Sequence, residues 1–158
     1  MVKTGSNFKL KTMSVTKKCF LSVLFMLMAC SIAKAQTDQI EGLWYNDIKS
    51  AKVSITRGAD GKFYGKVVWL KEPLKNGKPK VDEMNTNEKL RTRPRLGLPV
   101  LSGFVKDGDI KYTDGTIYDP LNGKTYSCNI TYKGSTLAIR GYIGISIIGR
   151  TTIWSRAE

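Results

Sequence analysis

The sequence of 158 residues contains no histidine and only three cysteines. Without histidine there is no imidazole base, which excludes Ser-His-Asp hydrolases, Cys-His proteases and His-ligated zinc sites. Any catalysis would have to use carboxylates, Lys, Tyr, Ser or Cys. Hydrophobic residues make up 41% of the chain and charged residues 25%, which is the composition of an ordinary globular domain.

Residues 1–35 are predicted to be a cleaved secretory signal peptide. Residues 1–18 carry five lysines and no acid, and an apolar run of 15 residues follows at 19–33. This run is too short to span a bilayer, and the sequence Ala-Lys-Ala after it is a typical cleavage site before Gln36. We therefore expect a periplasmic or extracellular protein whose mature chain has no transmembrane segment.

Two alternatives for the N-terminus stay open. Translation from Met13 instead of Met1 would give a signal peptide of more usual length. A lipoprotein box at Leu27-Met28-Ala29-Cys30 would instead place lipid on Cys30 and anchor the protein to a membrane. Cleavage near Ala35 is the favoured interpretation, because the box has methionine where a smaller residue is usual.

Residues 36–158 form a single predicted domain with a moderate positive charge. They hold 20 of the 26 Lys and Arg and all 13 Asp and Glu, a net charge of +7. The basic residues are scattered, so we expect no nucleic-acid partner, whereas contact with an anionic envelope surface is compatible with the charge. Cys128 is the one cysteine of this domain, which excludes an internal disulfide, and we expect it to be buried and inert.

From residue 40 onward the chain consists of short β-favouring runs separated by Gly, Asn and Asp, without helical periodicity. Alternating apolar and polar residues predict half-buried strands, and the tight turns between them predict hairpins. The fold class predicted is all-β: an antiparallel up-and-down meander closed into a roughly eight-stranded barrel. The candidate strands are Ile40–Tyr45, Ala51–Thr56, Lys62–Leu70, Pro99–Val105, Asp109–Thr113, Thr116–Tyr118, Lys124–Lys133, Ser135–Tyr142 and Ser146–Arg156.

Residues 71–98, called the flap below, interrupt this pattern. They are rich in Lys, Asn, Pro and Arg and contain no convincing strand. Asn85 or Thr86 is expected to cap a short helix through Arg91, which Pro94 must end. A connection of this length is uncommon without a role, and we interpret it as a lid or flap inserted into the barrel.

Two motifs give a resemblance to known barrels. Gly42-Leu43-Trp44 and Trp154-Ser155-Arg156 lie on the first and last predicted strands, an arrangement that resembles lipocalin-like (calycin) barrels. The resemblance implies that Gly42, Trp44, Trp154 and Arg156 close one end of the barrel, with the Arg156 side chain over the Trp44 ring.

The chain from Gly42 to Arg156 also resembles the small exported bacterial proteins of domain-of-unknown-function family number 2147. The residues that carry this resemblance are Gly42-x-Trp44, Tyr64-Gly65-Lys66-Val67, Asp82, Asn85, Leu90-Arg91-x-Arg93-Pro94, Gly97-Leu98, Gly115-x-Ile117-Tyr118-Asp119-Pro120-x-x-Gly123-Lys124-x-Tyr126, Gly141-Tyr142-x-Gly144, Gly149-Arg150 and Trp154-x-Arg156. The family implies no activity. Asn87 stands where an acidic residue would be expected, which weakens a cation site in the flap, and we predict no metal or cofactor.

Several arginines are candidate ligand-binding residues. Arg91 and Arg93, with Arg95, would present three guanidiniums on one side of an extended segment and could bind carboxylate or phosphate. The alternative is that they pair with acids of the flap. Arg140 and Arg150 lie within predicted strands, and fatty-acid carriers of similar barrels use interior Arg with Tyr, which adds Tyr142 by analogy.

The polar cluster of the flap, Asp82, Asn85 and Glu88, has no assigned catalytic role. Our leading interpretation is a non-enzymatic binder of a small hydrophobic or amphipathic anion inside the barrel. The first alternative is a carboxylate-dependent enzyme acting on envelope material, with Asp82, Glu83 or Glu88 as acid or base. The second is an envelope protein-interaction module with a solid barrel.

Overall fold

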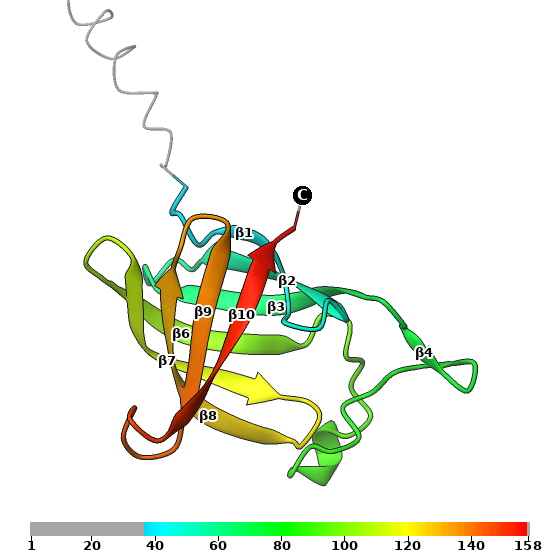
Figure 1. Cartoon of the computed structure of the whole chain (residues 1–158). Coiled ribbons are helices and arrows are strands. Elements are labelled where there is room, and N and C mark those ends of the chain that lie inside the picture. Colours follow the sequence, from blue (N-terminus) through cyan, green and yellow to red (C-terminus); the bar gives the residue numbers. More distant parts are fainter. Residues whose placement is uncertain (1–36, 158) are drawn as a thin grey trace, which may run out of the picture. The chain divides into compact units, whose positions relative to one another are not determined.

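Eight antiparallel strands close into a barrel (Figure 1). The structure is a computed structural model and describes residues 37–157, so the predicted signal peptide and Cys30 lie outside the described residues. The strands follow the ring order β1-β10-β9-β8-β7-β6-β3-β2, which confirms the predicted all-β meander. Their bounds are β1 Gly42–Tyr45, β2 Ala51–Arg57, β3 Phe63–Leu70, β6 Pro99–Asp107, β7 Lys111–Asp119, β8 Lys124–Tyr132, β9 Thr136–Tyr142 and β10 Gly149–Arg156.

Two predicted strand boundaries were wrong. The runs 109–113 and 116–118 belong to one strand, β7, because a register shift between Tyr112 and Gly115 absorbs the irregular residues as a bulge. Asp114 within this bulge has a positive φ of 59°. Strand β10 begins at Gly149 and not at residue 146, since residues 143–148 form a loop with a turn bond from Ile148 N to Ile145 O.

The flap contains more regular structure than the sequence suggested. Strands β4 (Leu74–Lys75) and β5 (Lys78–Pro79) form a small hairpin around Asn76 and Gly77, which both have positive φ as such a turn requires. The expected short helix is a single 3-10 turn, η2 (Glu88–Leu90). Asn87, and not Asn85 or Thr86, caps it by accepting a hydrogen bond from the Lys89 amide.

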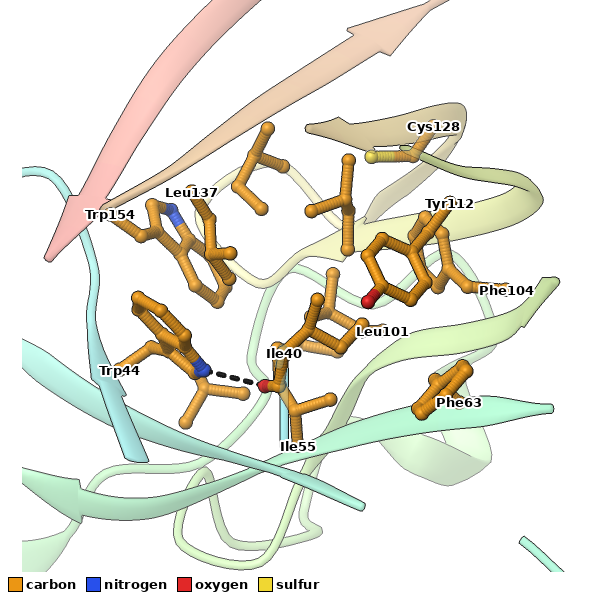
Figure 2. Packing of buried hydrophobic residues seen from close by; sticks show 14 of the residues in the cluster. Ile40, Trp44, Ile55, Phe63, Leu101, Phe104, Tyr112, Cys128, Leu137 and Trp154 are labelled. Atoms are coloured by element: carbon orange, nitrogen blue, oxygen red, sulfur yellow. Dashed lines mark hydrogen bonds between the residues drawn. The ribbon is translucent and has the colours of Figure 1, made fainter. Parts of the chain in front are cut away.

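The antiparallel connections alternate between two ends of the barrel. The β1–β2, β7–β8 and β9–β10 loops and the flap lie at one end, which we call the mouth; the β2–β3, β6–β7 and β8–β9 turns and residues 37–41 lie at the closed end. Figure 2 shows the buried cluster between them, where the Trp44 indole donates a hydrogen bond to the Ile40 carbonyl at 2.7 Å. No helix among the described residues is long and apolar enough to cross a membrane.

The closed end is sealed around Trp44. The Arg156 guanidinium lies 4.1 Å from the centre of the Trp44 ring, the arrangement that the resemblance to calycin barrels implies. The same guanidinium donates to the carbonyls of Glu41 and Gln39 at 3.2 and 2.5 Å. Gly42 leaves room for it, since a Cβ there would stand 2.8 Å from Arg156 Nη1.

Asp38 adds polar contacts beside the contact of Trp44 with Arg156, which we call the plug. Its carboxylate accepts hydrogen bonds from Lys106 Nζ at 2.7 Å and from the Tyr112 hydroxyl. Burial alone would raise the pKa of Asp38, but these hydrogen bonds and the Lys106 charge lower it below its usual range. The segment before β1 is therefore held across the barrel end by both apolar and charged contacts.

Candidate functional site

A cavity of about 850 Å³ fills the mouth half of the barrel and opens to solvent. Its floor is apolar and consists of Val53, Val67, Leu98, Val100, Ile139 and Trp154. The volume is within the range of small-molecule sites, and an apolar floor suits a hydrocarbon group. The barrel is thus packed solid toward the closed end and hollow toward the mouth.

The rim of the cavity combines apolar loop tips with a few polar groups. Ile48, Leu121, Ile143 and Ile148 reach it from three different loops. Tyr126, Tyr142, Arg95 and Arg150 also line it. The polar groups of the lining thus stand at the rim, above an apolar floor, which is the order expected for a ligand with one polar end.

Arg150 is the unpaired cation of this lining. It alternates along β10 with Thr152 and Trp154, which also line the cavity, so strand periodicity directs it inward. The backbone of Arg150 pairs with Gly141 on β9, but among residues 37–157 no group forms a hydrogen bond or ion pair with the Arg150 guanidinium. Arg95, by contrast, donates to the carbonyls of Val81 and Pro120 at 3.0 and 3.1 Å and is largely buried.

Arg140 lies outside the cavity, in contrast to its expected interior position. Its neighbours Ile139 and Gly141 line the cavity, and the strand alternation therefore turns Arg140 to the outer face. The guanidinium donates to the carbonyls of Ser146 and Ile147 at 2.7 and 2.9 Å. Arg140 thus supports the β9–β10 loop, and of the interior candidates only Arg150 and Tyr142 reach the lining.

Asp82 is the centre of a buried network that joins the flap to the barrel. The side chain is completely buried, and its carboxylate accepts hydrogen bonds from the Tyr118 hydroxyl at 2.6 Å and from Asn85 Nδ2 at 2.7 Å. Arg93 completes the network with two donors, Nε at 2.9 Å and Nη2 at 2.8 Å. Burial opposes ionisation, but these donors and the Arg93 charge together lower the pKa of Asp82.

Arg91, like Arg93, forms its hydrogen bonds and ion pair with other residues of the flap. Arg91 donates to the Asn85 carbonyl at 2.9 Å and pairs with Glu88 at 3.2 Å. Neither Arg91 nor Arg93 lines the cavity, whose only flap residues are Arg95 and Leu98. The structure therefore places the predicted polar cluster and these two arginines in one structural network and not with Arg150 or Tyr142.

The flap is fixed to the β7–β8 corner beside the mouth. A Cβ on Gly123 would stand 1.8 Å from the Met84 carbonyl oxygen, so the flap backbone runs directly against this turn. Arg95 adds its hydrogen bond to Pro120 in the same corner. These contacts and the Asp82 network hold the flap at the side of the opening.

The carboxylates of the flap show no geometry for acid or base work in the cavity. Asp82, Glu83 and Glu88 do not line it. The Lys75 ammonium, 2.9 Å away, lowers the pKa of Glu83, as hydrogen bonds lower that of Asp82. Within residues 37–157 there is also no group of three or more Cys, Asp or Glu side chains that could hold a metal ion.

Sequence reasoning missed three features of this region. From the sequence, Tyr118 was identified only within a candidate strand and within the family motif, although its hydroxyl anchors Asp82. The hydrogen bond from Arg95 to the Pro120 carbonyl in the β7–β8 turn depends on tertiary contacts that spacing does not encode. The exposed loop 143–148 was partly assigned to a strand. Its four isoleucines, with no charged residue among them, could have indicated an exposed apolar surface.

The closed meander, the Trp44–Arg156 plug and the cavity at the opposite end define a lipocalin-like barrel. The chain belongs to the family described as "Uncharacterized protein conserved in bacteria (DUF2147)", whose model matches residues 42–156. Among solved structures it is similar to protein HP1028 from Helicobacter pylori, described as belonging to the lipocalin family. The two share 27% identity with a TM-score of 0.68, over 77% of this chain and 85% of that one. A comparison with curated proteins found no match.

Proposed function

We propose that this protein is an exported, non-enzymatic carrier of a small amphipathic anion, whose hydrocarbon part occupies the barrel and whose acidic group binds Arg150. The observation that carries the proposal is the unpaired Arg150 at the rim of an apolar cavity of about 850 Å³. A lipocalin-like fold supports binding in the barrel, because the interior of an eight-stranded barrel holds one small ligand.

The chemistry of the lining favours an anion over a neutral ligand. A guanidinium presents several donors in one plane and forms its strongest hydrogen bonds with carboxylate or phosphate groups. Tyr126 and Tyr142 also line the cavity, and a tyrosine hydroxyl can donate to the same head group. The floor around Trp154 offers no charged partner, so the hydrocarbon part goes there.

Export to the periplasm or beyond belongs to this proposal and is supported by residues 1–35, with their basic start, apolar run and small-residue cleavage site. Exported proteins often contain disulfides, but this barrel is stabilised by its hydrophobic core and by the plug of Trp44 and Arg156. The N-terminal residue of the protein purified from its host tests cleavage before Gln36 against lipidation at Cys30.

Binding is tested with the barrel protein and two ligands of equal hydrocarbon length, palmitic acid and hexadecanol. Displacement of the fluorescent cis-parinaric acid measures each affinity, and native mass spectrometry measures the stoichiometry. Arg150→Gln is expected to weaken palmitate binding by about tenfold and to leave hexadecanol binding unchanged, because it removes one charge-assisted contact.

Lys66→Gln is the matched control, since Lys66 is exposed on the outer face of β3 and does not line the cavity. It removes the same charge and should leave both affinities unchanged. Palmitate binding that is absent, or equal in wild type and Arg150→Gln, would contradict the proposed role of Arg150.

A further inference from the structure

The β9–β10 loop carries four isoleucines that face solvent. Ile143, Ile145, Ile147 and Ile148 are separated only by glycine and serine, and the exposed fractions of Ile145 and Ile147 are 61% and 82%. Figure 1 shows this loop, coloured orange to red, projecting beyond the ends of β9 and β10. Exposed apolar side chains are common singly, but a continuous group on one loop marks a contact surface.

Ligand binding in the cavity does not explain this loop. Ile143 and Ile148 line the rim of the cavity, whereas Ile145 and Ile147 do not. Two other loop tips at the mouth, Ile48 and Leu121, are 69% and 68% exposed. The apolar surface therefore extends beyond the cavity lining to Ile145 and Ile147, and Ile147 has the largest exposed fraction of the exposed large hydrophobic residues.

Several backbone carbonyls of the β9–β10 loop already accept hydrogen bonds from within the protein, which lowers the cost of moving the loop out of water. Arg140 donates to the carbonyls of Ser146 and Ile147, and the Ile148 amide donates to the Ile145 carbonyl. Backbone groups without partners are costly to move out of water, and these three bonds remove part of that cost. They also hold the isoleucines at the tip in a fixed arrangement.

The charge around the mouth is positive. The four segments at this end, 46–50, 71–98, 119–124 and 143–150, contain eleven Lys and Arg and six Asp and Glu, a net charge of +5. The whole of residues 36–158 has a net charge of +7, so most of the excess lies at the mouth. Apolar loop tips and an excess of basic residues at the same end of the barrel match an anionic bilayer, in which isoleucine enters the acyl boundary and cations meet the head groups.

We infer that the mouth is a docking surface for an anionic lipid membrane, with Ile145 and Ile147 as its inserting residues. A partner protein could bind the isoleucines in a complementary apolar pocket, but such binding would not require the positive charge at this end of the barrel. The inference does not depend on the carrier function, because neither isoleucine lines the cavity.

The test is co-sedimentation of the purified barrel protein with vesicles of phosphatidylglycerol and phosphatidylcholine, compared with vesicles of phosphatidylcholine alone. The wild type is expected to bind the anionic vesicles and to be released by high salt, because the head-group contribution is screened. The double variant Ile145→Ser/Ile147→Ser is expected to lose at least about tenfold in partition, since two apolar side chains no longer enter the membrane.

Ile110→Ser/Ile153→Ser is the matched control. Ile110 lies in the β6–β7 turn at the closed end and Ile153 faces outward on β10, and both are about half exposed. This control should keep wild-type partition. Its failure to do so, equal partition of the Ile145/Ile147 variant and wild type, or equal binding to neutral vesicles would each overturn the inference.

Two further measurements distinguish membrane docking from ligand binding and from dimerisation. Displacement of cis-parinaric acid should be unchanged in the Ile145/Ile147 variant, so that loss of docking is separated from loss of ligand binding. Sedimentation velocity of the wild type should show a monomer at all concentrations used. Dimers that disappear in the Ile145/Ile147 variant would assign the loop to a second copy of the chain and overturn membrane docking.

Discussion

The Tyr118 hydroxyl donates a hydrogen bond of 2.6 Å to Asp82, across 36 residues of the chain. Tyr118 belongs to strand β7 of the barrel and Asp82 to the flap. Burial, followed by the hydrogen bond to Asp82, raises the pKa of the tyrosine, whereas the pKa of Asp82 is lowered. The pair is therefore held as a neutral phenol and a carboxylate, and it fixes the flap to the barrel wall.

Replacing this carboxylate should alter the acid stability of the protein. Because the pKa of Asp82 is lower in the folded state than its ordinary value of 3.8, its ionisation stabilises the fold above that value and the contribution disappears as pH falls through the folded pKa. Asp82→Asn should lower the free energy of unfolding by about 2 kcal/mol at pH 7, because one acceptor is replaced by a donor.

Urea unfolding from pH 7 to about pH 3 measures this effect. The difference between wild type and Asp82→Asn should shrink as pH falls below 3.8, where the carboxylate of the unfolded state binds a proton before that of the folded state. Asp109→Asn, an exposed change in the β6–β7 turn, is the control and should follow the wild-type curve. Parallel curves for wild type and Asp82→Asn would show that Asp82 does not carry the effect.

Gly123→Ala should detach the flap from the β7–β8 corner. Gly123 has a φ of 71°, and the added Cβ would stand 1.8 Å from the Met84 carbonyl oxygen. Both the backbone strain and the clash force the flap or the turn to move. Hydrogen exchange should become faster for the amides of Asp82 and Asn85, while the amides of β8 and β9 keep their protection.

The matched control for this change is Gly134→Ala. Gly134 has a similar φ of 73°, in the β8–β9 turn, but nothing lies within 4 Å of the added Cβ. It should show the cost of the strained backbone alone. Equal exchange of the flap amides in both variants would mean that the flap is not supported by Gly123.

Arg156→Met should destabilise the closed end by about 1–3 kcal/mol. The change keeps an apolar stem over Trp44 but removes the cation–π contact and the two bonds to the carbonyls of Glu41 and Gln39. Thermal unfolding measures the loss. Arg57→Met, which removes an exposed guanidinium 5.7 Å from the Phe63 ring, is the control and should cost much less.

Cys128 should not react with thiol reagents in the native protein at neutral pH. Its side chain is completely buried, and burial raises the pKa of the thiol to about 12, so little thiolate exists for the reaction. Addition of urea should make the thiol reactive with the same time course as unfolding. Rapid labelling of the native form would show that the β8–β9 wall opens.

The strands could be predicted because strand alternation and turn residues are local signals. Val53 and Ile55 face the core as their spacing requires, and the bulge near Asp114 disturbed only the continuity of one strand. The direction of Arg150 and Arg140 could not be fixed in the same way. Both lie near strand ends, and a register slip of one residue reverses the face that a side chain occupies.

The flap illustrates what local patterns leave out. Its acids and arginines were visible in the sequence, and pairing among them was one of two interpretations. That Asp82 is completely buried depends on Tyr118, whose relevance follows only from the folded arrangement. The hollow half of the barrel has the same origin, because the absence of a large inward side chain is a property of several strands together.

The barrel closes through two residue pairs, Trp44 with Arg156 and Tyr45 with Ser155, between its first and last strands. Every other neighbouring pair in the ring is a hairpin of consecutive strands or, for β3 and β6, spans the flap. Hairpins of this kind form from segments close in sequence, whereas the last seam joins the two ends of the domain and is the slowest contact to find. Ring closure is therefore expected to be the final folding event, and until it occurs β1 and β10 remain open edges that can pair with another chain.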